Sequence, residues 1–250
     1  MQRYFVAKEQ LQDRKAVIVG DDAHHIRRVM RLKPGDRVIV SDGAGRDCLA
    51  EIVATAGDEV TLSIIREQEA DGEPAVEVWV AQSLPKGDKM ETVIQKCTEL
   101  GASRFLPFTS ARTVVQYDAK KEAKRLERWM KIAKEAAEQA HRSKIPTVDA
   151  PRTWEELLAM LPRAGAAFLC YEQEQGHGLG QALRRYRETG AEQAAPIMLI
   201  VGPEGGFDPA EVASCLQAGA RAISLGRRIL RTETAAVVGL ACILYEYGEI

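Results

Sequence analysis

The sequence predicts an α/β protein with two domains, a small N-terminal β-barrel and a larger C-terminal domain with a mostly parallel sheet. The first part of the chain contains short runs rich in Val and Ile, separated by turn residues, as in a small barrel. From Ala75 onward, predicted strands alternate with predicted helices, the βαβ pattern of a parallel sheet. A polar, acidic segment that ends in Gly and Pro, residues 67–74, separates the two patterns. We therefore assign residues 1–72 to the barrel and residues 73–250 to the α/β domain.

The N-terminal domain is predicted to hold four strands and one helix. The helix is expected at residues 23–32, with Val29 and Met30 facing inward. Tight turns are expected at Pro34-Gly35-Asp36 and at Asp42-Gly43. The strands are expected at residues 16–20, 37–41, 48–55 and 59–65.

The C-terminal domain is predicted to alternate strands with helices. Asp88 and Glu91 have the spacing of a capping box, and Gly101 is a typical helix stop, so a helix is expected between them. A long amphipathic helix is expected at residues 120–144, and a final helix at residues 235–247 is apolar on nearly every side. That final helix must be buried in a core or against a partner. The stripe of the long helix comprises Leu126, Met130, Ala133, Ala137 and Ala140, and the strands are expected at residues 75–82, 104–108, 166–172, 196–201 and 221–226.

Composition narrows the class of protein. With 46% apolar and 28% charged residues, the chain of 250 residues can form a sizeable core. The net charge is −2, yet residues 86–144 hold 14 Lys and Arg against 8 Asp and Glu, a basic segment that is either a phosphate-binding surface or a solvated helix face. The five cysteines form no C-x-x-C pair, which argues against disulfides and zinc. Neither a signal peptide nor a membrane-spanning run is evident, so we expect a cytoplasmic protein without metal or membrane contacts.

The most specific local feature is the glycine loop, Gly202-Pro203-Glu204-Gly205-Gly206. It lies between a buried strand and a helix that Asp208, Pro209 and Glu211 are expected to start. Open α/β sheets bind ligands at this edge, and glycines allow close approach to the backbone. The loop lacks both G-x-G-x-x-G and G-K-[ST], and Glu204 would repel a pyrophosphate. It suits a neutral or cationic ligand, although a purely structural turn explains the glycines equally well.

A second feature is the basic loop before the final helix, residues 227–233. It follows a strand that ends at Gly226, and Thr232 or Thr234 is expected to cap the helix. Arg231 is the residue most suggestive of function here. Its alternative role is a salt bridge to Glu204 or Glu233.

Two further groups of basic residues are candidates for phosphate contacts. Arg27, Arg28 and Arg31 lie on the short N-terminal helix, where they could grip an RNA backbone. Lys86, Lys89 and Lys96 accompany a strand-to-helix turn on the ligand side of the sheet. Each of these side chains could equally be ordinary solvated surface. His24 and His25 are adjacent and without a third ligand, so they are not expected to bind metal.

A set of motifs along the whole chain resembles the ribosomal RNA small-subunit methyltransferase E family. The motifs are RYF at residues 3–5, HHIRRVMRLKPGD at 24–36, QSLPKGDKMETVIQKCTELG at 82–101, AEQAHRSKIPTV at 137–148, LIVGPEGGF at 199–207 and SLGRRILRTETA at 224–235. The resemblance implies a PUA-like RNA-binding β-barrel followed by a trefoil-knotted SPOUT methyltransferase domain. It also implies a homodimer that uses S-adenosylmethionine to methylate N3 of a uridine in 16S ribosomal RNA of the small subunit.

The resemblance, together with the chemistry of uridine N3 and the positions of the basic residues, suggests roles for individual residues. Arg231 would stabilise charge on the uracil ring, and Glu233 or Glu204 would accept its proton. RNA would contact Arg3, Arg27, Arg28, Arg31, Lys86 and Lys89. S-adenosylmethionine would be held by Leu169, Tyr171, Glu172, Val201, Gly202, Pro203, Glu204, Gly205, Gly206, Leu225, Gly226, Ile229, Leu230, Arg231, Thr232, Thr234 and Ala235.

Two alternatives remain open at this point. One is a knotted enzyme that methylates ribose 2′-oxygen on transfer or ribosomal RNA. The other is a non-catalytic RNA-binding factor in ribosome assembly. Nucleoside analysis of the product and a donor-binding measurement would distinguish them.

Overall fold

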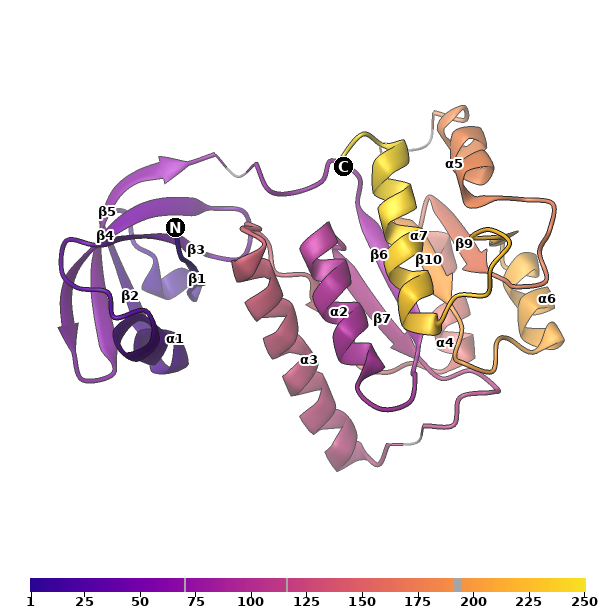
Figure 1. The fold of residues 1–250 in the computed structure, drawn as a ribbon, viewed down its shortest axis with the longest axis horizontal. Helices are drawn as coiled ribbons and strands as arrows, with labels where there is room; N and C mark the ends of the chain where they lie inside the picture. Colours follow the sequence, from indigo (N-terminus) through magenta and orange to yellow (C-terminus); the bar gives the residue numbers. More distant parts are fainter. Residues whose placement is uncertain (70, 116, 191–194) are drawn as a thin grey trace. The chain divides into compact units, whose positions relative to one another are not determined.

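The computed structural model describes residues 1–69, 71–115, 117–190 and 195–250. These residues form two compact units, one of residues 1–73 with 134–145 and the other of residues 74–133 with 146–250 (Figure 1). The chain first leaves unit 1 one residue beyond the expected boundary. It then returns to unit 1 through residues 134–145, which the sequence prediction placed wholly in the second domain. The periodicity of apolar residues could not reveal this return, because the chain passes from one unit to the other within a single uninterrupted helix.

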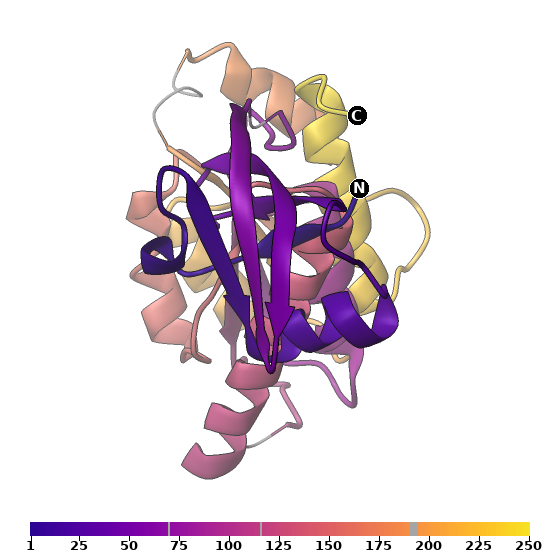
Figure 2. The same ribbon diagram turned by 90° about the vertical axis from the view of Figure 1, so that its left-hand side faces the viewer.

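Unit 1 is built on a five-stranded sheet in the order β1-β3-β4-β5-β2. The strands β1 and β3 pair in parallel, and the other neighbours pair antiparallel. The sheet is curled, as Figure 2 shows, so the expected barrel is present as a half-barrel with β1 and β2 at its edges. The four expected strands are confirmed, whereas β1 is too short to be predicted from periodicity. The strands are β1 (Arg3–Phe5), β2 (Lys15–Val19), β3 (Arg37–Ser41), β4 (Asp47–Ala56) and β5 (Glu59–Gln68).

The helical insertion of unit 1 differs from its prediction in register. It begins as α1 (Gly20–His24) and continues as a π-helical turn, His25–Val29. Because the turn uses wider i→i+5 hydrogen bonding, the residues that face the core change. Ala23 and Ile26 are fully buried, whereas Val29 is 61% exposed, so the inward orientation predicted for Val29 is wrong.

Unit 2 contains a six-stranded sheet in the order β11-β9-β10-β6-β7-β8, in which every neighbouring pair is parallel. This confirms the predicted α/β class. Short turns of 3-10 helix occur at Lys8–Gln10 in unit 1 and Leu161–Arg163 in unit 2. The elements of unit 2 and its connecting helix are β6 (Val78–Ser83), α2 (Lys89–Leu100), β7 (Arg104–Phe108), α3 (Ala119–Gln139), β8 (Thr147–Val148), α4 (Trp154–Leu158), β9 (Ala166–Cys170), α5 (Leu179–Arg187), β10 (Ile197–Val201), α6 (Pro209–Gln217), β11 (Arg221–Ile223) and α7 (Thr232–Glu246).

Helices cover both faces of this sheet, which gives three layers (Figure 1). In β10, Leu199 and Val201 point into a core shared with α2, α5 and α7, and Met198 and Ile200 point into a core shared with α4 and α6. All five residues of β10 are buried, as expected for a central parallel strand. The arrangement brings the carboxyl ends of β9, β10 and β11 to one edge of the sheet.

Three local predictions for the helices α2 and α3 are corrected by the structure. Asp88 precedes α2 without making a capping hydrogen bond, because its carboxylate pairs with Arg125 at 3.3 Å. Glu91 likewise pairs with Arg125 at 3.0 Å and with an arginine one turn further along α3. The apolar stripe of α3 passes through Trp129, which is 1% exposed, and not through Met130, which is 54% exposed. The helix ends at Gln139, before the predicted residue 144, since His141 has a φ of 58°.

Among the residues that the structure describes, no helix combines the length and the apolar character that a bilayer crossing needs. The knot and the dimer stay predictions.

Candidate functional site

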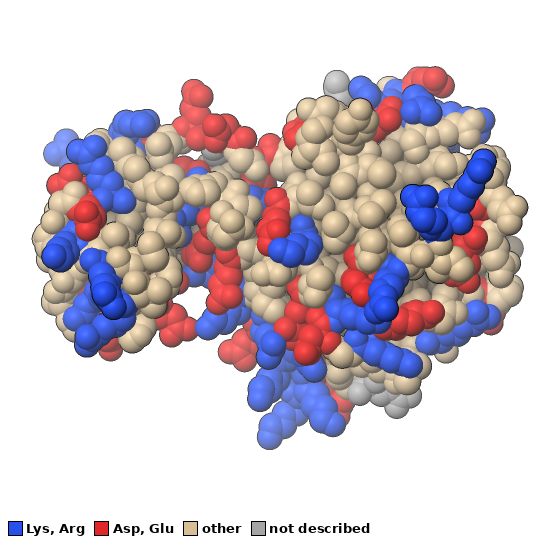
Figure 3. Space-filling model, in the orientation of Figure 1, with Lys and Arg blue, Asp and Glu red and all other residues tan. Residues whose placement is uncertain are grey.

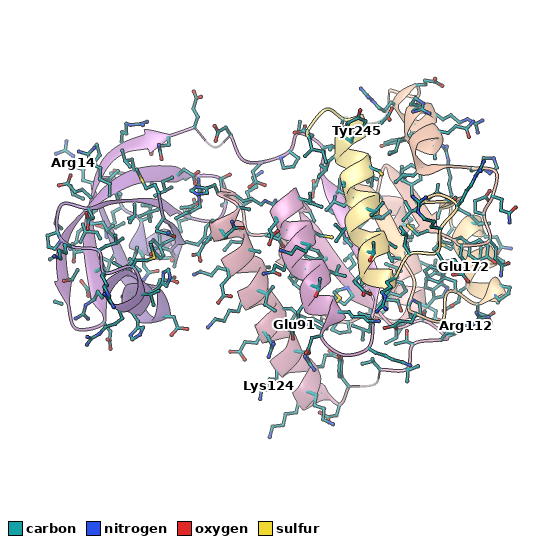
Figure 4. The ribbon with its side chains drawn as sticks, in the orientation of Figure 1. Arg14, Glu91, Arg112, Lys124, Glu172 and Tyr245 are labelled. Atoms are coloured by element: carbon teal, nitrogen blue, oxygen red, sulfur yellow. The ribbon has the colours of Figure 1, made fainter. Side chains whose placement is uncertain are left out.

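Three loops meet at the carboxyl edge of β9, β10 and β11 and enclose a cavity of about 440 Å³. They are residues 170–172, 201–207 and 224–232, and Figure 4 labels Glu172 at this edge. Parallel α/β sheets bind ligands at such an edge, and the volume lies in the range of small-molecule sites. The lining residues are Lys89, Cys170, Tyr171, Glu172, Val201, Gly202, Pro203, Glu204, Gly206, Phe207, Ser224, Leu225, Gly226, Arg227, Arg228, Ile229, Leu230, Arg231, Thr232 and Ala235.

The glycine loop follows β10 directly and leads into α6. Gly206 has a φ of +67°, and a Cβ placed on it would lie 2.9 Å from Oε1 of Glu172. The positive φ disfavours any residue with a side chain at this position, and an added Cβ would also require the Glu172 carboxylate to move. The predicted start of α6 is confirmed, since Asp208 accepts a hydrogen bond from the Ala210 amide and Glu211 accepts one from the Asp208 amide, each at 3.0 Å.

Hydrogen bonds hold the glycine loop from two sides. The hydroxyl of Thr232 donates to the Gly202 carbonyl at 2.6 Å and accepts from the Gln82 amide at 2.8 Å. Arg112, labelled in Figure 4, donates to the Gly205 carbonyl at 3.0 Å. Thr232 thus joins the two loops and does not cap α7 as predicted. The residue that precedes α7 is Arg231, which makes no side-chain capping bond.

A charged cluster lies on the rim of the cavity. The Lys89 ammonium donates to Oε1 of Glu204 at 2.7 Å, and the Lys86 amide donates to the same oxygen at 3.1 Å. Burial alone would raise the pKa of Glu204, but these hydrogen bonds hold it below the usual value. Glu233 lies further away, with Oε2 at 3.9 Å from the Lys89 nitrogen, and that oxygen has no hydrogen-bond partner among the described residues.

Arg231 is exposed at the cavity rim. In the part of the chain that the structure describes, its guanidinium makes no hydrogen bond or ion pair, so the alternative salt bridge to Glu204 or Glu233 is not formed. Arg227 and Arg228 are likewise exposed and unpaired within these residues. An unpaired arginine beside a cavity is a positive group available to a ligand.

The cavity brings together most of the residues predicted to bind S-adenosylmethionine, but three of them and the predicted proton acceptor Glu233 lie outside it. Leu169 is fully buried in the core, and Thr234 is exposed away from the lining. Gly205 faces Arg112, whose Cβ would lie 3.3 Å from an added Cβ, and Glu233 does not reach the lining. Sequence reasoning missed Cys170, Phe207, Ser224, Arg227 and Arg228, although the two arginines stand within the SLGRRILRTETA motif.

The residues predicted to contact RNA differ in their exposure and in their ion pairs. Arg3 is buried, with a 2.6 Å ion pair to Asp47, so the prediction that it contacts RNA is wrong. Arg28 and Arg31 are exposed and Arg27 is half-buried, and none of the three has an ion pair among the described residues. Lys89 lines the cavity in its pair with Glu204, whereas the Lys86 side chain is exposed. No group of three or more potential metal-ligating side chains occurs within the described ranges.

Comparison with known proteins places this geometry in a family. Residues 72–244 match the family model described as an RNA methyltransferase domain, and residues 18–65 match one described as an RNA methyltransferase PUA domain. A curated protein of Bacillus subtilis, Ribosomal RNA small subunit methyltransferase E, is 38% identical over 98% of this chain and 97% of its own length.

Two solved structures are similar to this chain over nearly its whole length. The Ribosomal RNA small subunit methyltransferase E of Neisseria gonorrhoeae, bound to S-adenosylmethionine, aligns with a TM-score of 0.82 and 27% identity over 98% of this chain and 97% of that one. A putative methyltransferase of Legionella pneumophila, also with bound S-adenosylmethionine, aligns with a TM-score of 0.84 and 26% identity over 97% and 96% of the two chains. The family model covers residues 72–244, and the Bacillus subtilis relative is 38% identical over 98% of this chain, so the chain belongs to the ribosomal RNA small subunit methyltransferase E family.

Proposed function

We propose that the protein transfers the methyl group of S-adenosylmethionine to N3 of a uridine in 16S ribosomal RNA, acting on the small ribosomal subunit in the cytoplasm. The observation that carries this proposal is a cavity whose rim presents the glycine loop together with Arg231, which has no partner among the described residues. The names of the relatives and the donor bound to two of them support the same activity.

The residues of the cavity fit S-adenosylmethionine. Gly206 lines the cavity with a φ of +67°, so its backbone is kept free of a side chain where a ligand can approach closely. Glu172 and Glu204 supply negative charge beside the cavity, and Leu225 and Leu230 supply apolar surface. Carboxylates suit a cation and apolar side chains suit an adenine ring. When bound, the donor supplies an electrophilic methyl group on a positively charged sulfur.

The chain's own contribution to the chemistry is the stabilisation of charge on the uracil ring. N3 of uridine carries a proton and is a poor nucleophile until that proton leaves. As it leaves, negative charge spreads onto the neighbouring carbonyl oxygens. The planar guanidinium of Arg231, free of other partners among the described residues, can donate to such an oxygen and stabilise this charge.

Neither of the two candidate glutamates is well suited to accept the proton from N3. Glu204 accepts two hydrogen bonds, and its lowered pKa makes it a weak proton acceptor. Glu233 lies outside the cavity lining. We therefore propose that Arg231 increases the acidity of N3 and that the proton leaves to water, with neither glutamate acting directly.

Other surfaces complete the proposal. Arg227 and Arg228, at the mouth of the cavity, are placed to contact phosphates next to the target base. Arg27, Arg28 and Arg31 would contact RNA elsewhere.

The face of α7 that carries Cys242 and Tyr245 is exposed and largely apolar, which supports a homodimer formed through this helix. The other side-chain contacts of that face would come from Val238 and Ala241.

The test is methyl transfer from labelled S-adenosylmethionine to small-subunit particles, followed by digestion of the RNA to nucleosides. We expect label in N3-methyluridine. Label in a ribose 2′-O-methyl nucleoside would instead identify the protein as a ribose 2′-O-methyltransferase. Binding of RNA without donor binding would identify a non-catalytic assembly factor.

A further inference from the structure

The amino-terminal part of α3 carries a concentration of positive charge that the proposed catalytic site does not use. Residues 119–133 contain six basic residues, Lys or Arg, and only two acidic residues, both Glu. Four of the cations follow one another at intervals of four, four and three residues, which places them on one face of the helix. All four are exposed, and we name them the basic stripe: Lys120, Lys124, Arg128 and Lys131.

This arrangement does not serve the stability of the helix. The amino end of a helix has positive dipole character, so cations in its first turns are unfavourable there. Like charges four residues apart, as in Lys120 and Lys124, also repel each other. A sequence chosen for helix stability would place acidic residues here, and the first turn has only Glu122. Positive charge kept at an energetic cost indicates a partner of opposite charge.

Neighbouring acidic groups leave part of the stripe unneutralised. Asp118 pairs with Lys121 at 3.3 Å, and Glu91 of α2 pairs with Arg125 at 3.0 Å and with Arg128 at 2.6 Å. Within the described residues, the ammonium groups of Lys120 and Lys124 make no ion pair or hydrogen bond. These two lysines are therefore available to an external anion.

The position of the stripe suits an extended polyanion. The first turns of α3 project beyond the rest of unit 2 in Figures 1 and 2, and Figure 4 labels Lys124 there. Figure 3 shows blue side chains gathered at this end. From Lys120 to Lys131 the helix rises about 16 Å, a length that spans several nucleotides. The apolar side of α3 is buried at Trp129 and Ala133, so the helix lacks the wide apolar face with which a membrane-surface helix inserts.

We propose that the basic stripe of α3 binds the phosphate backbone of the substrate RNA, as a contact surface separate from the cavity and from the arginines of unit 1. This inference rests on the proposed function for the identity of the RNA. Phosphate contacts fix the position of a nucleic acid without reading its sequence. The stripe would therefore contribute to affinity and to its salt dependence, and not to the methyl-transfer step.

The test compares the full-length wild-type protein with the double variant Lys120→Gln, Lys124→Gln. Its matched control is Arg163→Gln, Arg185→Gln, which removes the same formal charge from two exposed arginines of unit 2 that have no ion pair among the described residues. Affinity for a small-subunit RNA fragment is measured across a range of salt concentrations. Removing two phosphate contacts should lower the slope of log affinity against log salt by about 1.4 to 1.8. The control should leave the slope unchanged.

Two further measurements isolate the stripe from the catalytic site. Donor affinity and the single-turnover rate at saturating RNA should match wild type in the stripe variant. An unchanged salt slope, or an equal loss in the control, overturns the proposal. So does wild-type binding to anionic phospholipid vesicles that the stripe variant loses while its RNA affinity is retained. Nucleoside analysis of the wild-type product tests the proposed function separately, because a wrong methylation site would leave the effect on the salt slope intact.

Discussion

The ammonium nitrogen of Lys89 lies 2.7 Å from Oε1 of Glu204, which ties the first turn of α2 to the glycine loop. Both side chains line the cavity. The two residues are 115 positions apart in the chain, and each belongs to a motif that the sequence presents separately. The pair makes Glu204 an ionised, hydrogen-bonded support for the loop.

Lys89→Met should make the stability of the protein less dependent on acid pH. The pKa of Glu204 in the folded protein is below its ordinary value of 4.5, so its contribution is fully present above that value and is lost as pH falls through the folded pKa. We expect the difference in Tm between wild type and variant to be largest near neutral pH and to shrink below pH of about 4. Thermal unfolding from acid to neutral pH measures it.

The matched control is Lys96→Met, which removes an exposed pair with Glu99 within α2. Its Tm should differ little from that of wild type at neutral pH. A Tm difference for Lys89→Met that is constant across the pH range would show that the lysine acts through packing alone.

Gly206→Ala should weaken donor binding without unfolding the protein. The added Cβ would lie 2.9 Å from a carboxylate oxygen of Glu172, and φ at this position is +67°. We expect at least a tenfold loss of S-adenosylmethionine affinity by titration calorimetry, equivalent to about 1.4 kcal/mol. Gly180→Ala in α5 is the control, since its Cβ has ordinary space, at 3.5 Å from Arg184. Normal affinity in the Gly206 variant would remove this loop from the donor site.

Arg3→Met should destabilise the protein and leave RNA binding unchanged. Its partner Asp47 has a side chain only 2% exposed, and the change leaves that carboxylate buried without its cation. The expected cost is about 3–5 kcal/mol in the free energy of unfolding, measured by urea denaturation. Arg37→Met, which breaks an exposed pair with Glu51, should cost less than about 1 kcal/mol. A loss of RNA affinity in a folded Arg3 variant would restore the role that the sequence predicted.

The sequence was most informative where one local pattern decides a structure. The Asp208 capping box and the uniformly buried strand β10 were predictable, because their hydrogen bonds and burial depend on adjacent residues. Asp88 has the same spacing as Asp208 but does not cap its helix, because Arg125 of α3 pairs with the carboxylates of both Asp88 and Glu91. That competition depends on which helices pack together, and no periodicity contains it.

The site was predictable in its loops and less so in its side chains. The two motifs located the cavity, but the orientation of Gly205 toward Arg112 depends on a segment some ninety residues away. The burial of Arg3 similarly depends on its pairing with Asp47, 44 positions along the chain. A basic residue in a motif is read as a ligand contact until the structure shows which acidic residue it meets.

Cys242 should be protected from thiol reagents in the assembled homodimer. It is the exposed cysteine of the five, and it lies on the α7 face proposed to meet the partner. Among the others, Cys170 has its pKa raised to about 12 by burial, so it reacts poorly. Tyr245→Arg should separate the protomers and speed the alkylation of Cys242. Mass spectrometry of labelling, alongside light scattering, measures both. Rapid labelling of a wild-type dimer would place the interface elsewhere.

Arg231→Ala should slow the chemical step while leaving binding largely intact. If the guanidinium stabilises charge that develops only as N3 loses its proton, its removal should lower the single-turnover rate by about 10²–10³-fold. Arg231→Lys should recover part of the rate, because a point charge cannot reproduce a planar pair of donors. Raising the pH should partly rescue the alanine variant, since more uridine ionises without help.

Arg228→Ala is the control, because Arg228 is also exposed and unpaired among the described residues. It should weaken RNA affinity and show no alkaline rescue. Weak donor binding by Arg231→Ala with no rescue at high pH would instead make Arg231 part of the donor site.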